Sequence, residues 1–468
     1  MNFGYSYHNT LEEHRGTLDG YDNATLREYV TMLSHEPFVT QRQAAEWLGI
    51  SKQDLLDLNT VIRNDEILQD YIQHSGIGKK YYKNTILPLF ATGKIQASIL
   101  NEYSYPERIG LYTGFSCMFY CNFCGRNYNE KYDRKLADES FAMFTRMIDE
   151  DPKTDWNWRN RLRISGGVEP LTNPLTNNII THGAEQGYNV QLYTNGYLLS
   201  DRYCNDNPGI FDLGALRFSI YGVDQKTTFA VTQNDKAFNT VQENIVNFLN
   251  RPELKETNVG LNYILLPGKT NEIYGFLDYI RSIHSRTTAR IAFCTIREDH
   301  SQSLVAITNE ERERLIAVLG DVDNICATDP LLKDVHFDYG YALDSLRYNH
   351  ISGPLQMVNF HEMVRTGFPQ VNVCVDVKSD VYLYHESGFV GRPGATRYVI
   401  GNIKEKTLDD VCRAWVESGK TITPRPGDTG YLDAFDHTTS IMINQYRDNI
   451  AYGVGLYEGP VNLARHDG

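Results

Sequence analysis

The sequence predicts an α/β protein built around a parallel sheet. The main observation is a regular repetition between residues 106 and 310, where short apolar stretches of strand character alternate with helical stretches. Strands that alternate with helices in this way are typical of a parallel sheet with helical crossovers. The repetition is absent before residue 106 and fades beyond residue 310, which suggests one region on each side. The predicted strands are residues 107–115, 161–165, 189–196, 215–222, 258–268 and 289–299.

The region before the sheet, residues 1–105, is predicted to be mostly helical. Apolar residues recur at helical spacing between Gln43 and Leu58, with Gly49 at a turn and Ser51 as an N-cap. This outline resembles a helix-turn-helix, so DNA binding is one interpretation and a helical bundle that covers another domain is the other. The bundle is favoured because the region carries few basic residues, which a DNA-binding face requires.

The region after the sheet, residues 311–468, is predicted to be a mixed segment that covers the substrate. Residues 370–389 and 394–403 have strand character. Residues 406–419 are predicted to form a helix. This region therefore closes the predicted architecture of three parts.

Composition and charge limit the classes of partner. The chain has 468 residues and a formal net charge of −14, which argues against a general nucleic-acid or anionic-membrane surface. No apolar run approaches the ~20 residues that span a bilayer, and the N-terminal segment lacks the features of a signal peptide. The eight cysteines are not spaced as a disulfide framework. We therefore expect a cytoplasmic globular protein with no nucleic-acid and no membrane partner.

Three cysteines directly after the first predicted strand are the strongest chemical signal. Cys117, Cys121 and Cys124 form a C-x3-C-x2-C run. Thiolate sulfur prefers iron or zinc. A structural zinc site normally has four protein ligands, but the next histidine and cysteine along the chain are His182 and Cys204. Three cysteines instead suit a four-iron, four-sulfur (4Fe-4S) cluster whose fourth iron is open to an outside ligand, and zinc is the alternative.

This spacing, with the aromatic Phe123 before the last cysteine, resembles the signature of the radical S-adenosylmethionine (SAM) superfamily. The resemblance implies a partial (β/α)6 TIM-like barrel with its chemistry at the carboxyl ends of the strands. It also implies that S-adenosylmethionine binds the open iron. One electron, supplied by a flavodoxin or ferredoxin, then releases a 5′-deoxyadenosyl radical, and the protein positions the reacting groups.

Polar motifs at the ends of the predicted strands are the candidates for binding this cofactor. Glycines in the SGGVEP motif allow a close backbone approach, and Glu169 in the same motif is predicted to anchor either the methionyl ammonium or the strand end. Asn195 in YTNG is predicted to face the methionyl portion, with a helix cap as the alternative. The cofactor-binding candidates are Phe123, Gly166, Gly167, Glu169, Asn195, Ser219 and Arg297.

The resemblance extends to one family within this superfamily. Motifs such as YYKNTILPL, SGGVEPLTNP, NYILLPG and FDYGYALDSLR, spread over residues 80–445, are similar to those of the radical ammonia-lyases (deaminases) that act on TDP-4-amino-4,6-dideoxy-D-glucose. These enzymes belong to the biosynthesis of desosamine, an antibiotic deoxysugar. The resemblance implies a nucleotide-sugar substrate, hydrogen abstraction at C3 and loss of the C4 amino group as ammonia, which gives a 3-keto-4,6-dideoxy sugar. One departure is Gly196 in YTNG, where serine is expected.

The segments after the barrel are expected to hold the sugar nucleotide. Arginine suits a diphosphate because it binds bidentately, so Arg347 and Arg397 are the main diphosphate candidates. Glu386 or Asp376 is the candidate catalytic acid or base near C3 or C4, and a plain salt bridge is the alternative for each. The substrate-binding candidates are Asp338, Tyr339, Tyr341, Arg347, Tyr384, Arg397, Lys83 and Arg126.

Two other classes of function stay open. A radical dehydrogenase or epimerase could act on a sugar nucleotide or an aminocyclitol, and an epimerase would need a cysteine as hydrogen-atom donor. Cys294 and Cys374 are the candidates, and both are predicted to be buried in strands. A non-catalytic iron–sulfur or zinc DNA-binding regulator would use the N-terminal helices, and the acidic balance argues against it.

Overall fold

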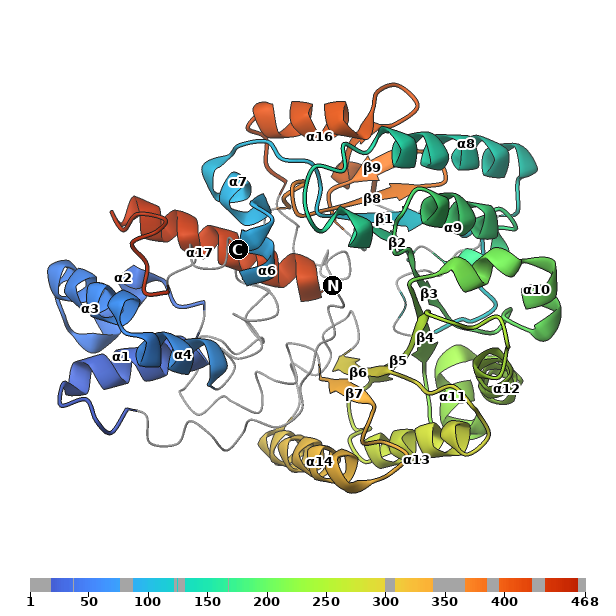
Figure 1. Ribbon diagram of the computed structural model, residues 1–468, viewed down its shortest axis with the longest axis horizontal. Helices are drawn as coiled ribbons and strands as arrows, with labels where there is room; N and C mark the ends of the chain where they lie inside the picture. Colours follow the sequence, from blue (N-terminus) through green and yellow to red (C-terminus); the bar gives the residue numbers. More distant parts are fainter. Residues whose placement is uncertain are drawn as a thin grey trace.

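The computed structural model describes residues 18–36, 38–75, 87–121, 124, 131–166, 168–298, 308–339, 367–384, 395–422 and 434–461. Within these residues, one curved sheet carries helices along its outer side, and a second group of helices lies beside it (Figure 1). None of the described helices combines the length and the apolar character needed to cross a bilayer.

The described part of the sheet has ten strands in the order β10-β9-β8-β1-β2-β3-β4-β5-β6-β7. Neighbouring strands from β8 to β7 in this order run parallel, whereas β9 and β10 are antiparallel. Helices connect the parallel strands from β1 to β7, as crossover connections require. The strands are β1 (Arg108–Tyr112), β2 (Leu162–Ile164), β3 (Gln191–Thr194), β4 (Ala215–Ile220), β5 (Asn258–Leu265), β6 (Phe293–Glu298), β7 (His336–Asp338), β8 (Asn372–Asp376), β9 (Asp380–Tyr382) and β10 (Val399–Asn402).

The helices that connect these strands, together with α16 after β10, cover the outer side of the sheet (Figure 1). Side chains such as Asp133 before α8 and Thr308 before α14 cap them by accepting backbone N–H bonds that the first turn leaves open. In α8, Phe144, Met147 and Ile148 are buried in the main core, and Phe141 of the same apolar face is partly buried against it. The helices are α8 (Arg134–Glu150), α9 (Thr176–Glu185), α10 (Asp201–Asp206), α11 (Gln225–Thr232), α12 (Ala237–Leu249), α13 (Glu272–His284), α14 (Asn309–Thr328) and α16 (Leu408–Glu417), with short 3-10 turns η2 (Trp158–Asn160), η3 (Pro170–Thr172), η4 (Pro208–Asp212) and η8 (Ala395–Tyr398).

The predicted strands are all present as β1 to β6, with shorter bounds than the sequence pattern suggests. The structure adds a parallel strand at each edge of this set. β7 continues the sheet beyond β6, and β8, from the region after residue 311, pairs in parallel with β1. A short turn then leads from β8 into the antiparallel β9. The mixed region predicted at the C-terminal side is therefore part of the same sheet.

The helices before residue 105 form a bundle with a core of its own. Gly49 ends α2 with a left-handed φ of 64°, and Ser51 caps α3 through its side chain, as predicted. The helix α17, from the far end of the described chain, contributes Ile441, Met442 and Ile443 to the same core. The segment with the helix-turn-helix outline thus lies in a bundle that α17 completes. The helices are α1 (Ala24–His35), α2 (Gln41–Leu48), α3 (Lys52–Asn64), α4 (Glu66–His74), α6 (Leu87–Ala91), α7 (Lys94–Leu100) and α17 (Ala434–Ala451).

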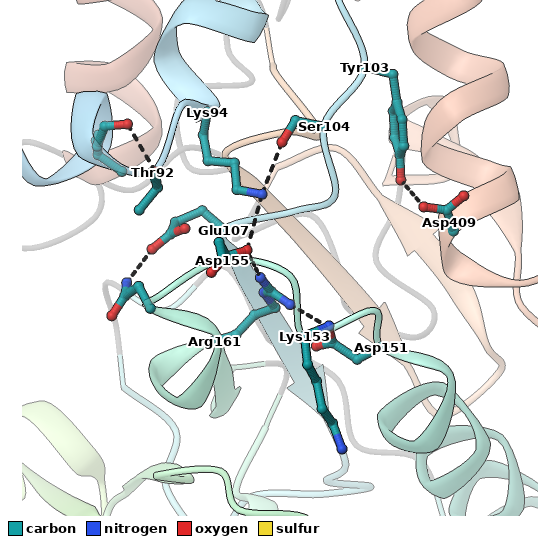
Figure 2. Close-up of polar contacts among 12 residues, drawn as sticks. Thr92, Lys94, Tyr103, Ser104, Glu107, Asp151, Lys153, Asp155, Arg161 and Asp409 are labelled. Carbon is teal, nitrogen blue, oxygen red and sulfur yellow. Dashed lines mark hydrogen bonds and ion pairs between the residues drawn. The ribbon is translucent and has the colours of Figure 1, made fainter. Parts of the chain in front are cut away.

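A buried ionic network lies next to the amino-terminal ends of β1 and β2 (Figure 2). Arg161 is fully buried and pairs with Asp151 (Nη1 to Oδ1, 2.5 Å) and with Asp155. Lys94 of α7 pairs with Asp155 (Nζ to Oδ2, 3.3 Å) and donates to the Ser104 hydroxyl (2.9 Å). Buried charges are tolerated when they are paired and hydrogen-bonded. The network therefore fastens the helical region to the sheet at the end opposite the cysteine loop.

Candidate active site

The three cysteines lie in the loop that follows β1, at the carboxyl end of the parallel strands. Cys121 is buried, Cys117 and Cys124 are half-buried, and all three carry free thiols. The Cys124 N–H donates to the Cys121 carbonyl oxygen (3.0 Å), which closes a turn between these two residues. We call residues 116–124 the cysteine loop.

Two backbone hydrogen bonds fasten this loop to neighbouring elements. The Glu169 N–H donates to the Ser116 carbonyl oxygen (2.9 Å), and the Tyr120 N–H donates to the Thr232 carbonyl oxygen (2.8 Å). The first bond joins the loop to the segment after β2, and the second joins it to the end of α11. The described part of the loop is thus held from two sides by main-chain contacts.

Aromatic side chains line the cysteine loop. The Phe119 ring centroid lies 5.6 Å from that of Tyr197 and 5.9 Å from that of Tyr221, both in edge-to-face geometry. Burial, followed by the charges of the nearby cysteines, raises the pKa of Tyr221 well above its usual value, so the hydroxyl stays protonated. Ser219, a predicted cofactor contact, is hydrogen-bonded to Tyr221. Tyr221 shares a face of the extended segment with Ser219, as the spacing of two between them predicts, but it is not among the predicted cofactor residues.

Glu169 ties the ends of β2 and β3 together. Its carboxylate accepts hydrogen bonds from the Thr194 hydroxyl (2.5 Å), the Asn195 N–H (2.8 Å) and the Leu171 N–H (3.2 Å). The side chain is buried, and burial raises the pKa of Glu169 to about 7, against the opposing effect of these hydrogen bonds. Of the two roles that the sequence predicts for Glu169, the hydrogen bonds match the strand anchor. Contact with a methionyl ammonium stays a prediction.

The Asn195 amide lies against the cysteine loop. Its Nδ2 is 3.5 Å from Cys117 Sγ and 3.1 Å from Met118 Sδ. Its Oδ1 accepts a hydrogen bond from the Tyr197 N–H (2.9 Å). A predicted cofactor residue is therefore placed directly beside the first predicted cluster ligand. Contact between Asn195 and the methionyl portion of a cofactor stays a prediction.

Two glycines at this edge of the sheet are required by close contacts. Gly166 has a φ of 65°, and a Cβ there would lie 2.2 Å from a ring atom of Tyr112. Gly196 has a φ of 75°, and a Cβ there would lie 2.6 Å from a ring atom of Phe218. Both the backbone conformation and the contact exclude a larger residue. The packing of Phe218 thus explains why glycine stands where the family pattern leads one to expect serine.

The donor set fits an iron–sulfur cluster. In the part of the chain that the structure describes, no three His, Cys, Asp or Glu side chains converge where one metal ion could bind. A four-iron cluster does not require such convergence, because each thiolate binds a separate iron. The sulfur donors also lie among aromatic side chains, with an amide N–H beside one of them, and such surroundings tune clusters of this kind. Cys117, Cys121 and Cys124 are the residues that would hold the cluster.

Other predicted site residues lie at the same edge of the sheet, several strands from the cysteine loop. Arg297 is half-buried near the end of β6, and Asp338 is the last residue of β7. Tyr339 follows directly and donates its hydroxyl to Asp323 of α14 (Oη to Oδ1, 2.5 Å). The predicted residues that fall outside the described ranges are Lys83, Phe123, Arg126, Gly167, Tyr341, Arg347 and Glu386.

Asp376, predicted as a catalytic acid or base, ends β8 next to β1. Its fully buried carboxylate accepts hydrogen bonds from the Lys378 N–H (2.9 Å), the Asp380 N–H (3.1 Å) and the Tyr382 hydroxyl (3.0 Å). Burial, with a smaller contribution from Asp380, raises the pKa of Asp376 to about 7. Such a pKa suits proton exchange near neutral pH, but both oxygens are bound within the β8–β9 hairpin. A catalytic role for Asp376 stays a prediction.

The predicted substrate residues Tyr384 and Arg397 lie near β9 and β10. The Tyr384 ring packs edge-to-face on Tyr398 with centroids 5.2 Å apart, and its hydroxyl donates to the Ile422 carbonyl oxygen (2.6 Å). The Arg397 guanidinium lies 5.8 Å from the Tyr398 ring centroid. Tyr384 and Tyr398 belong to an aromatic cluster that also includes Tyr112 at the end of β1. Binding of a sugar nucleotide by these residues stays a prediction.

Solved structures with a similar fold are distant from this chain. SuiB from Streptococcus suis, bound to its precursor peptide SuiA, has a TM-score of 0.47 and 14% identity, and the match covers 71% of this chain and 70% of SuiB. The anSMEcpe structure with bound AdoMet and Cp18Cys peptide has a TM-score of 0.44 and 14% identity, over 65% of this chain and 80% of that one. Because these scores lie below 0.5, the family assignment depends on sequence.

A parallel sheet with three cysteines in the loop after its first strand is the arrangement that the sequence resemblance to the radical S-adenosylmethionine class of enzyme leads one to expect. The dTDP-4-amino-4,6-dideoxy-D-glucose ammonia-lyase of Streptomyces venezuelae is 34% identical to this chain over 424 residues, which are 90% of this chain and 86% of that enzyme. The chain therefore belongs to the family of this ammonia-lyase. No family model matches the chain.

Proposed function

We propose that the protein is a radical S-adenosylmethionine ammonia-lyase that acts on a 4-amino-4,6-dideoxyhexose nucleotide, such as dTDP-4-amino-4,6-dideoxy-D-glucose. The observation that carries this proposal is the 34% identity, over 90% of the chain, to an enzyme named for that substrate. The position of the free thiols supports it, because the carboxyl ends of parallel strands are where such sheets bind ligands. The expected products are ammonia and a 3-keto-4,6-dideoxy sugar nucleotide.

In this function Cys117, Cys121 and Cys124 would hold a 4Fe-4S cluster, and S-adenosylmethionine would be the second cofactor. Together, when bound, these cofactors supply a 5′-deoxyadenosyl radical for hydrogen abstraction at C3. The chain's own residues fix the geometry: Glu169 and Asn195 hold the end of β3 against the cysteine loop. The Phe119 ring packs edge-to-face against Tyr197 and Tyr221 and so fixes the middle of the loop.

A flavodoxin or ferredoxin is the proposed electron donor, and the cytoplasm is the proposed compartment. All eight cysteines carry free thiols, and cysteines of this kind persist where the surroundings are reducing. The cluster ligands in particular must remain thiolates in order to bind iron.

The same hydrogen abstraction could instead lead to oxidation or epimerisation of the sugar. An epimerase would need a thiol that reaches the substrate, but Cys294 and Cys374 are both fully buried in strands, as their sequence positions predict. Among the residues that the structure describes, no contact specifically favours oxidation of the sugar over elimination. Elimination of ammonia is therefore the reaction that we propose.

An anaerobic assay of the reconstituted protein tests this function. Iron and sulfide are counted first, with about four of each expected per chain. The protein is then incubated with dTDP-4-amino-4,6-dideoxy-D-glucose, S-adenosylmethionine and a reductant, and ammonia, 5′-deoxyadenosine and the sugar product are quantified. A 4-amino-3-keto product without ammonia would assign a dehydrogenase instead. Zinc in place of iron would overturn the radical reaction.

A matched pair of alanine variants provides the control. Cys121→Ala is expected to lose both the iron and the 5′-deoxyadenosine. Cys204→Ala removes a buried thiol in α10, outside the cysteine loop, and should keep both. Equal loss in the two variants would mean that the assay reports general damage and not the cluster ligand.

A further inference from the structure

The side chain of Asn195 is buried between the end of β3 and the cysteine loop. Only 4% of the residue is exposed. Its Nδ2 lies 3.5 Å from Cys117 Sγ and 3.1 Å from Met118 Sδ. These contacts join residues that are 78 and 77 positions apart in the chain. The amide therefore links the third strand of the barrel to the first predicted cluster ligand.

The orientation of this amide is set by its neighbours. The Asn195 Oδ1 accepts the Tyr197 N–H (2.9 Å). If the amide were turned over, its NH2 group would face another N–H donor, which is unfavourable because neither group can accept. The Oδ1 must therefore face the backbone, and the NH2 group must face the sulfur atoms.

The backbone on both sides of Asn195 is also fixed. Glu169 accepts the Asn195 N–H (2.8 Å) and the Thr194 hydroxyl (2.5 Å). The Thr194 hydroxyl oxygen in turn accepts the Gly196 N–H (3.0 Å). Because Glu169 and Thr194 hold the main chain at Asn195 and Gly196, the Asn195 amide is preorganised before any cofactor binds.

We propose that Asn195 is a positioning residue that donates an N–H···S hydrogen bond to the Cys117 thiolate of the bound cluster and thereby raises the reduction potential of that cluster. A donor at a ligand sulfur withdraws negative charge and so favours the reduced, more negative state of the cluster. This inference rests on the proposed function for the presence of the cluster, but it does not depend on the identity of the sugar. It assigns to Asn195 a partner other than S-adenosylmethionine.

The test compares reduction potentials in the full-length, reconstituted protein without S-adenosylmethionine or sugar. The potential is measured by redox titration, followed through the electron paramagnetic resonance signal of the reduced cluster. Asn195→Leu removes the donor and keeps the branched shape of the side chain. Loss of one hydrogen bond to a charged group should decrease the equilibrium constant for one-electron reduction roughly tenfold, which corresponds to a shift of ~59 mV to lower potential.

Asn244→Leu is the matched control. Asn244 is a buried amide whose NH2 group donates to the Gly196 and Tyr197 carbonyl oxygens of the same turn (2.9 and 3.0 Å), so its substitution loosens this turn without removing the N–H beside the sulfur atoms. It should lower stability and leave the potential unchanged. An unchanged potential in Asn195→Leu, or an equal shift in Asn244→Leu, would overturn the proposal.

A second Asn195 variant covers the case in which Asn195→Leu does not retain iron. Asn195→Ser keeps a small polar side chain that is too short to reach Cys117 Sγ, and the same lower potential is expected. Loss of iron from both Asn195 variants, with full iron in Asn244→Leu, would show a purely structural role and also overturn the proposal. Failure of the proposed function gives a different result, because the wild-type protein would then lack the cluster or release no ammonia.

Discussion

Replacing Arg161 by leucine is expected to destabilise the fold strongly, at a point remote from the cysteine loop. Arg161 is fully buried and pairs with Asp151 and with Asp155. Its guanidinium also lies 4.9 Å from the ring centroid of Tyr105. Leucine would pair with neither carboxylate. Lys94 would remain as a partner of Asp155 (3.3 Å), and Asp151 would lose its guanidinium.

The magnitude follows from these contacts. Removing one partner of a buried ion pair costs ~3–5 kcal/mol, because the other charge stays buried. The lost cation–π contact adds about 1 kcal/mol. A total of about 4–6 kcal/mol is a large part of a typical protein stability of ~5–15 kcal/mol.

Urea unfolding, followed by circular dichroism and tryptophan fluorescence, measures this loss of stability. Arg202→Leu is the control, since the Arg202 side chain is 92% exposed and forms a weak surface pair with Asp206 (3.6 Å). The same substitution there should leave the unfolding midpoint unchanged. Equal midpoints for the two variants would refute the reasoning.

Three further predictions concern the site. Glu169→Gln should detach the end of β3, because the NH2 group of glutamine would face a backbone N–H where the carboxylate oxygen now accepts a hydrogen bond. The loss of one such bond to a charged group costs ~1.5–3 kcal/mol and should appear as a lower urea midpoint and a lower iron content. Burial raises the pKa of Asp376 from an ordinary 3.8 to about 7, so its contribution to stability is present at low pH and is lost as the pH rises to about 7. Asp376→Asn should remove this decrease of the urea midpoint with pH, and a decrease equal to that of the wild type would contradict the prediction. Gly196→Ala should destabilise the protein by about 1–3 kcal/mol, because its φ is 75° and its Cβ would meet Phe218; a thermal midpoint equal to that of the wild type would contradict the contact.

The sequence by itself determined the features that depend on local periodicity and spacing. The alternation of apolar stretches predicted β1 to β6, and the glycine turn with its serine cap predicted the boundary between α2 and α3. The spacing of Cys117, Cys121 and Cys124 placed three thiols in one short loop whatever the rest of the chain does. These features involve residues close in sequence, so few conformations compete with them.

Only the tertiary structure decided which distant segments meet. β8 pairs with β1, and α17 completes the N-terminal bundle, because burial of an apolar face requires a partner but does not specify which segment supplies it. The same holds for the site: the contact of Asn195 with Cys117 spans 78 positions and depends on the register of β1, β2 and β3. A sequence pattern shows that these polar residues lie at strand ends. The parallel register then determines which donor faces which acceptor.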